Sequence, residues 1–196
     1  MISVSDRHGA KCAECPLFVE GKPPVPDEFN AGSRVLYSGQ EPGRDEEREG
    51  VPFVGESGDV LRNYNFQSGV KASYFNPVKC YPGRGVKLPE AQWIKACRCC
   101  APWAVHGLTQ FYETHDPRRV PVFLLGGRAL RAFTGHASVS QFRGEMLQIE
   151  KGPVAVLLPP ELRRRIFAHV SYHPAASMHS GNAEYTTAMK ADIDRM

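Results

Sequence analysis

The sequence predicts an α/β fold with three layers, in which helices cover both faces of a central, mostly parallel sheet. Two observations support this prediction. Short runs rich in β-branched and aromatic residues alternate along the chain with longer segments of helical pattern. The clearest run, residues 120–125, ends in Gly126-Gly127 and passes directly into a helical segment, which is the strand–turn–helix unit of an α/β sheet.

The expected elements follow one another in order. Strands are predicted at residues 35–37, 74–80, 120–125, 154–158 and 168–172. Helices are predicted at residues 57–69, 89–106, 128–133 and 183–196, with a short basic helix or insertion at 158–167. Residues 1–34 are expected to form an irregular arm, because the prolines of residues 22–26 break any helix. No repeat or second domain is visible, so residues 1–196 are interpreted as a single domain.

Composition narrows the classes of protein. A chain of 196 residues with 42% hydrophobic content can bury one sizeable core. Its net charge of +3 excludes a histone-like polycation, so any contact with nucleic acid must come from a local patch. No stretch approaches the roughly 18 apolar residues that span a bilayer, and the first residues lack a signal-peptide core. We therefore expect a cytoplasmic protein without a membrane partner.

The six cysteines are clustered along the chain. Cys12 and Cys15 form a C-x-x-C pair, Cys80 stands alone, and three more lie close together at Cys97, Cys99 and Cys100. In a reducing compartment such a set favours metal or cluster binding over disulfides. Four thiolates can hold either tetrahedral zinc or an iron–sulfur cluster, and the ligand type alone does not decide between them.

The stretch 35–58 looks like a ligand loop. A strand feeds a Gly/Pro turn that carries Gln40 and Glu41, and Phe53 follows between two glycines. Open α/β sheets bind their ligands at the carboxyl ends of the strands. An apolar ring beside a carboxylate and free backbone N–H groups suits a planar, polar, ring-shaped ligand. The alternative is an ordinary loop with surface acids.

Two later strands bring further polar residues to the same edge. Asn76 lies within the second predicted strand, and His173 follows the last one. Each has a plain alternative, a turn residue before proline for Asn76 and a capped surface residue for His173. The basic run at residues 163–165 is either a solvated face or a DNA contact.

Several ordered motifs resemble the uracil-DNA glycosylase superfamily, and most closely its iron–sulfur-containing family 4. The likeness covers nearly the whole chain. The matching segments are Cys12–Leu17, Gly39–Gly43 with Glu46-Glu47, Gly50–Gly55, Phe75–Cys80, Leu124–Gly126, Arg143-Gly144 and His173-Pro174. The resemblance implies a four-stranded sheet and a DNA-repair enzyme that flips uracil out of DNA.

The resemblance also implies roles for individual residues. Phe53 would stack on the flipped uracil within a site that includes Gly39 and Gly43, Asn76 would read the uracil edge, and His173 would stabilise the anionic leaving base. Asparagine can accept from N3–H and donate to O4, a pairing that rejects cytosine.

DNA contacts and cluster ligands are implied in the same way. Met178 stands where the family usually has a leucine wedge, with Ser177 beside it and Arg143 as a further DNA contact. The cysteines Cys12, Cys15, Cys80 and Cys97 would hold a [4Fe–4S] cluster, with Cys99 and Cys100 as alternatives for the fourth position. Zinc in the same site is the other candidate.

The first motif departs from family 4. Its Gln40-Glu41 order is similar to the GQDPY motif of family 1, where the acid directs the attacking water. Glu41, supported by Gln40, is therefore the expected water-directing carboxylate, with Glu46, Glu47 or no strong base as alternatives. Gly43 stands where family 1 has the tyrosine that excludes thymine, so 5-substituted uracils are possible substrates. The loop that carries a DNA-trapping histidine in one relative has none here.

The expected activity is that of a monomeric, monofunctional uracil-DNA glycosylase acting on single- or double-stranded DNA and leaving an abasic site. No lysine is placed to form a Schiff base. The alternatives are a protein of this fold that binds DNA or uracil without turnover, and an enzyme for a 5-modified pyrimidine. A zinc-stabilised protein unrelated to DNA is a further alternative.

Overall fold

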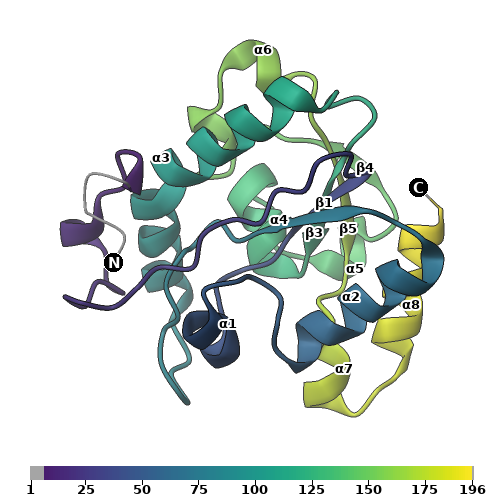
Figure 1. The fold of residues 1–196 in the computed structure, drawn as a ribbon, viewed down its shortest axis with the longest axis horizontal. Helices are drawn as coiled ribbons and strands as arrows, with labels where there is room; N and C mark the ends of the chain where they lie inside the picture. Colours follow the sequence, from purple (N-terminus) through teal and green to yellow (C-terminus); the bar gives the residue numbers. More distant parts are fainter. Residues whose placement is uncertain (1–6, 196) are drawn as a thin grey trace.

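The protein, described for residues 7–195 in a computed structural model, is built on one five-stranded sheet (Figure 1). The strands are β1 (Val35–Ser38), β2 (Ala72–Phe75), β3 (Val122–Leu125), β4 (Met146–Gln148) and β5 (Phe167–Ser171). Their spatial order is β2-β1-β3-β5-β4, with every neighbouring pair parallel except β4 and β5. The predicted fold class is confirmed, but the sheet has five strands, not four.

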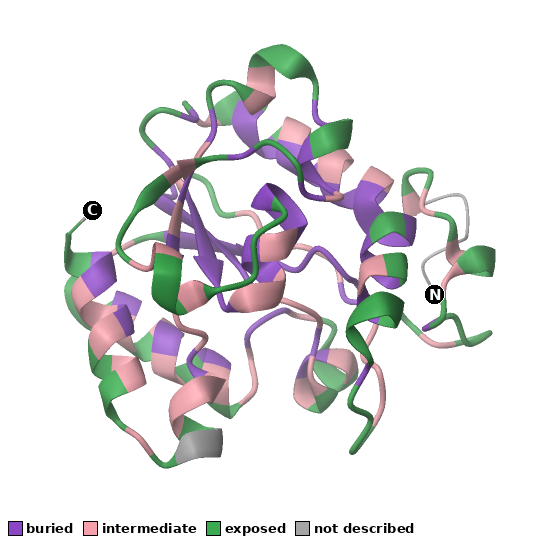
Figure 2. Ribbon diagram, turned by 180° about the vertical axis from the view of Figure 1, so that it is seen from behind, coloured by how far each residue is buried: buried purple, intermediate pink, exposed green. Residues whose placement is uncertain are grey.

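Helices cover both faces of the sheet. Alternate strand residues pack with α3 (Glu90–Thr114) and α4 (Gly127–Thr134) on one face, and with α2 (Glu56–Ser68) and α8 (Glu184–Asp194) on the other. Leu36 and Tyr37, for example, are neighbours in β1 but belong to different cores. Figure 2 shows the strands buried between these layers. None of the helices in residues 7–195 has the length and apolar character needed to cross a bilayer.

Two strand predictions were wrong. The apolar run 154–158 forms a 3₁₀ turn, η3 (Ala155–Leu157), which contacts α3 and α4 instead of pairing with a strand. A short apolar run between prolines fits a turn as well as a strand, so periodicity could not separate them. The place beside β5 is taken by β4, whose three residues gave no strand signal. The strand expected at 74–80 ends at Phe75, because Asn76-Pro77 leaves the ladder.

The helices also differ in length from the prediction. α3 continues to Thr114 through an internal Pro102. Helix α6 (Pro160–Arg163) lies within the short basic helix or insertion expected at 158–167, whereas three short helices were not predicted: α1 (Arg44–Glu49), α5 (Val139–Phe142) and α7 (Ala175–Ser180). The end of the predicted last helix, Met196, and residues 1–6 of the arm lie outside the described residues.

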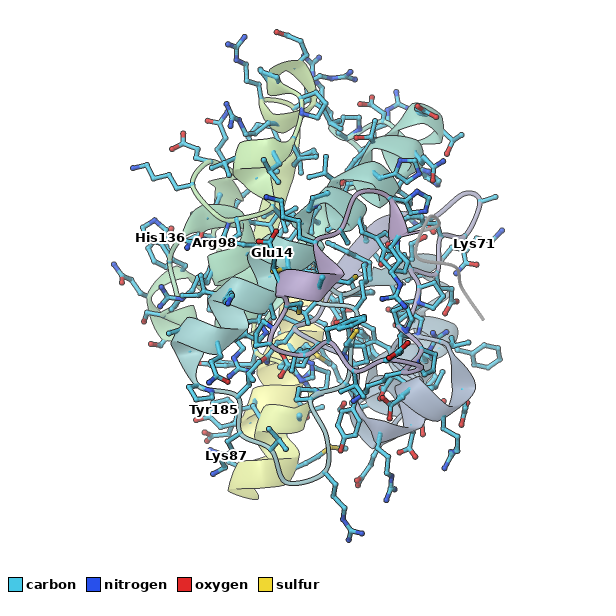
Figure 3. All side chains as sticks on the ribbon, turned by 90° about the vertical axis from the view of Figure 1, so that its left-hand side faces the viewer. Glu14, Lys71, Lys87, Arg98, His136 and Tyr185 are labelled. Carbon is cyan, nitrogen blue, oxygen red and sulfur yellow. The ribbon has the colours of Figure 1, made fainter. Side chains whose placement is uncertain are left out.

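The rest of the arm is tied to the body by backbone bonds. Lys11 N donates to Cys99 O at 2.9 Å, and Val25 N donates to Lys79 O at 2.7 Å. Nearby, Asp27 and Lys79 form a buried ion pair. Figure 3 shows the single turn η2 (Cys12–Glu14), marked by Glu14, lying against the body of the molecule. The arm is thereby brought to α3, which carries the second group of cysteines.

Candidate active site and cysteine cluster

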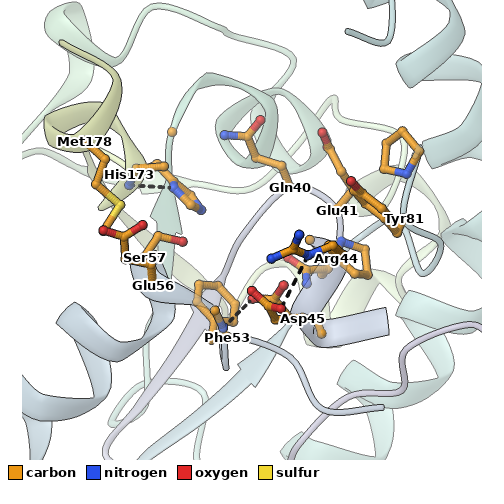
Figure 4. A pocket seen from close by; sticks show the side chains of 18 of the residues that line it. Gln40, Glu41, Arg44, Asp45, Phe53, Glu56, Ser57, Tyr81, His173 and Met178 are labelled. Atoms are coloured by element: carbon orange, nitrogen blue, oxygen red, sulfur yellow. Dashed lines mark hydrogen bonds and ion pairs between the residues drawn. The ribbon is translucent and has the colours of Figure 1, made fainter. Parts of the chain in front are cut away.

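The main cavity, of about 730 Å³, opens at the carboxyl ends of the parallel strands. The loops after β1, β2, β3 and β5 all contribute to its lining. β1 and β3 are adjacent, with the chain winding outward from them in both directions, so the cavity lies at the topological switch point of the sheet. In Figure 4, His173 and Met178 come from one wall, Tyr81 and Glu41 from the other, with Phe53 and Gln40 between them.

Phe53 forms the floor of the cavity and is held in a strained backbone conformation. Its φ is +57°, a region that bulky residues rarely adopt, and its side chain is buried. Arg62 Nε donates to the Phe53 carbonyl at 2.7 Å, and a Cβ at Gly58 would overlap the same backbone. This local clamp fixes the ring, whose centroid lies 6.3 Å from that of His173.

Asn76 lies beside Phe53 at the end of β2, and only 5% of its surface is exposed. A Cβ at Gly39 would overlap the Asn76 side-chain oxygen and the Phe53 ring. Glycine at this position therefore lets the amide and the ring approach each other. The predicted ring platform and the predicted edge reader thus border the same space.

His173 follows β5, and its hydrogen bond fixes the position of the proton. Nδ1 accepts from Ala175 N at 3.2 Å, so the neutral ring carries its proton on Nε2. Because His173 also lines the cavity, it supplies a hydrogen-bond donor at the strand end.

Glu41 lines the cavity but is held from both sides. Trp93 Nε1 donates to one carboxylate oxygen and Arg128 Nη1 to the other, each at 2.7 Å. Burial raises the pKa of Glu41 above its ordinary value, and Arg128 opposes that shift. Arg128 also donates to Leu88 O at 2.5 Å. No local pattern in the sequence indicates this network, because it joins residues far apart in the chain.

Gln40 points toward a different part of the cavity from Glu41. A Cβ at Gly126 would lie 3.0 Å from Gln40 Nε2 and 3.2 Å from His173 Cβ. Gln40 is therefore packed over the glycine turn after β3, near the histidine. Its amide and the His173 ring face the same end of the cavity.

Two other acids of the first motif are separated by the fold. Glu46 is buried, lines the cavity and accepts from Gly55 N at 3.1 Å. A Cβ at Gly43 would overlap its second carboxylate oxygen, so Glu46 occupies the space that a side chain at position 43 would take. Glu47 lies outside the cavity lining and pairs with Lys22 at 3.1 Å.

The residues expected at the DNA are placed differently from one another. Met178 lines the cavity with 38% of its surface exposed, and Val86, which the sequence did not single out, does so with 52% exposed. Ser177 and Arg143 do not line it. The Ser177 hydroxyl is 2.6 Å from that of Thr186. Arg143 Nε lies 2.9 Å from Asp192 Oδ2, and this ion pair connects the segment before β4 to α8.

A second, small cavity is surrounded by thiols. Five of the six cysteines line it, together with Phe18: Cys12, Cys15, Cys80, Cys99 and Cys100. The structure places Cys97, expected as the fourth ligand, outside this group in the apolar core. A hydrogen bond from Cys100 is the main reason that the pKa of Cys15 falls to about 6, so a thiolate forms readily here. These cysteines therefore bring three segments of the chain together at one cavity: the N-terminal arm, the segment that follows β2, and helix α3.

Comparison with known proteins agrees with this arrangement. The family model for the uracil DNA glycosylase superfamily matches residues 26–193. A type-4 uracil-DNA glycosylase of Thermotoga maritima is 25% identical over 94% of this chain and 87% of its own length. One of Pyrobaculum aerophilum is 29% identical over 84% of this chain and 78% of its own. The chain therefore belongs to the uracil-DNA glycosylase superfamily.

Proposed function

We propose that this protein is a monofunctional uracil-DNA glycosylase of the type-4 kind, which hydrolyses the N-glycosidic bond of uracil in DNA and leaves an abasic site. One observation carries the proposal. An aromatic ring, an amide and an imidazole N–H border one cavity at the switch point of the sheet. A base can reach such a cavity only after it has left the stack, so the enzyme acts on a flipped nucleotide.

Uracil is recognised by Phe53 and Asn76. The base stacks on the Phe53 ring, an interaction worth about 1–3 kcal/mol. The Asn76 amide accepts from N3–H and donates to O4, whereas cytosine presents the opposite pattern at these two atoms. Burial of Asn76 makes a mismatch costly, because an unpaired amide then loses its hydrogen bonds to water.

His173 stabilises the departing base. Cleavage of the glycosidic bond leaves negative charge on uracil and positive charge on the sugar. The Nε2–H of a neutral imidazole is a suitable donor to O2, and the Ala175 N–H bond to Nδ1 keeps that tautomer. Gln40, packed beside the histidine, adds a polar amide at the same end of the site.

We assign Glu41 a positioning role in place of direct activation of water. Its two oxygens already accept from Trp93 and Arg128, which fixes the loop after β1 against α3 and α4. The attacking water is then oriented by this loop. Direct water activation by Glu41 remains the competing assignment and makes a different kinetic prediction.

Glu46 closes the part of the site next to Gly43. Where a larger residue at position 43 would exclude a methyl group, the carboxylate of Glu46 fills the space. We propose that this carboxylate sterically crowds the 5-methyl group of thymine. The same feature argues against an enzyme dedicated to bulky 5-modified pyrimidines.

The DNA is bound at the rim of the cavity. Met178, on α7, and Val86, in the loop after β2, are exposed apolar side chains that line the cavity and are suited to enter the space left by the flipped base. Ser177 and Arg143 support this rim indirectly, Ser177 through Thr186 and Arg143 through Asp192. The substrate is uracil-containing DNA, single- or double-stranded, bound by a monomer in the cytoplasm.

The cysteines fit an iron–sulfur cluster. Cys12, Cys15, Cys80 and Cys100 form the proposed [4Fe–4S] ligand set, since Cys97 lies elsewhere. Four thiolates can also hold tetrahedral zinc, so zinc in the same site is the alternative occupant. When bound, the cluster supplies a covalent link between the arm, the segment after β2 and α3.

The test is base release from an oligonucleotide with one uracil, followed by alkali. Wild-type protein is expected to yield strand breaks only after alkali. Asn76→Ala and His173→Ala should each lower the rate at least about 100-fold, while Gln67→Ala, on the exposed face of α2, should leave it unchanged. Breakage before alkali, or no release by protein that binds the oligonucleotide, would contradict the proposal.

A further inference from the structure

The thiol cavity has one cysteine more than a [4Fe–4S] cluster requires. Five cysteines line it, and the two from α3 are adjacent in sequence, Cys99 and Cys100. The side chains of adjacent helix residues point about 100° apart around the helix axis. Cys99 and Cys100 can therefore line the same cavity only because the cavity lies over the part of the helix surface between their two directions. Both lie within hydrogen-bond reach of the Cys15 sulfur.

The two α3 cysteines are held independently of each other. Cys99 is fixed through its backbone, because its carbonyl accepts from Lys11 N of the arm at 2.9 Å. The Cys100 sulfur accepts from the backbone N–H of Lys79, which precedes the ligand Cys80. Each of the two residues is therefore held against a different segment that carries cluster ligands: Cys99 through its backbone against the arm, and Cys100 through its sulfur against the segment after β2.

We infer that Cys99 and Cys100 are interchangeable fourth ligands, so that the cluster survives the loss of either one. The inference rests on the cluster proposed above. The other three ligands have no such neighbour in the cavity: Cys12, Cys15 and Cys80. Exchange between the two thiols changes only which sulfur binds the fourth iron and needs no oxidant or reductant. The protein would thereby keep its arm in place when one α3 thiol is oxidised or alkylated.

The test is a set of full-length serine variants made under iron-replete conditions. Iron and acid-labile sulfide per chain and the visible absorbance of the cluster are measured. Cys12→Ser, Cys15→Ser and Cys80→Ser should each lower bound iron about tenfold or more. Cys99→Ser and Cys100→Ser should each retain iron close to the wild-type amount, and the Cys99→Ser/Cys100→Ser double variant should lose it. Cys97→Ala, on the same helix but outside the cavity, is the matched control.

Each other outcome counts against the inference. Loss of iron in either α3 single variant shows one dedicated fourth ligand, and retention in the double variant shows that neither binds. Loss in Cys97→Ala alone would return the fourth position to Cys97. Wild-type protein without iron would refute the cluster itself. Base release by the same preparations is scored separately, so failure of the ligand assignment is distinguishable from failure of the glycosylase proposal.

Discussion

Glu41→Gln separates a positioning role from direct activation of water. In the native protein Trp93 and Arg128 each donate to one oxygen of this carboxylate at 2.7 Å. Glutamine has one oxygen, so one of the two bonds is lost and an NH₂ group faces a donor. A hydrogen bond to a charged group contributes about 1.5–3 kcal/mol.

Two effects reduce that loss. Burial already disfavours the charged form, as the raised pKa of Glu41 shows, and Arg128 keeps a second carboxylate, Glu90, at 3.6 Å. We therefore expect Glu41→Gln to lower the free energy of unfolding by about 1–2 kcal/mol. With the loop still in place, kcat should fall less than about tenfold, compared with the 10²–10⁴-fold typical of a lost general base.

The assay combines urea unfolding with single-turnover base release between pH 5 and 8. Arg128→Met is the companion variant, because it loosens the same loop and leaves the carboxylate in place. A positioning role predicts similar kinetic losses in the two variants and an unchanged pH profile. A fall of more than about 100-fold in Glu41→Gln alone, with loss of the acid limb of the profile, would refute the reasoning.

Three further predictions follow from single contacts. Glu46→Ala should raise thymine release relative to uracil by about 10- to 200-fold, the range for one methyl group in a pocket; an unchanged ratio in a competition assay would place thymine exclusion elsewhere. Gly58→Ala should cost about 1–3 kcal/mol and lower uracil release, since its Cβ overlaps the Phe53 backbone; Gln67→Ala in the same helix is the control, and equal denaturation midpoints would contradict the clamp. Burial lowers the pKa of His169, so below about pH 6.5 the unfolded chain binds a proton that the folded chain resists; stability should fall as the pH drops toward 5, and His169→Gln should flatten that slope in urea unfolding.

The sequence was sufficient for the fold class and for the residues at the strand ends. Val122–Leu125 followed by two glycines specifies a strand, a turn and a helix through local chemistry alone. Parallel strands place their carboxyl ends at one edge, and for that reason Phe53, Asn76 and His173 could be expected to meet. They do border one cavity.

Only the tertiary structure decided which partners these residues have. From the sequence alone Glu41 is expected to be an acid without a bound partner. Its hydrogen-bond donors, Trp93 and Arg128, lie 52 and 87 positions away in the chain. The sequence resemblance favoured Cys97 as the fourth ligand over Cys99 and Cys100, and helical periodicity alone does not say where the arm crosses the helix. The crossing places Cys99 and Cys100 at the thiol cavity and Cys97 in the core. Local sequence patterns determine individual helices and strands, whereas contacts between residues far apart in the sequence depend on how the complete layers pack against one another.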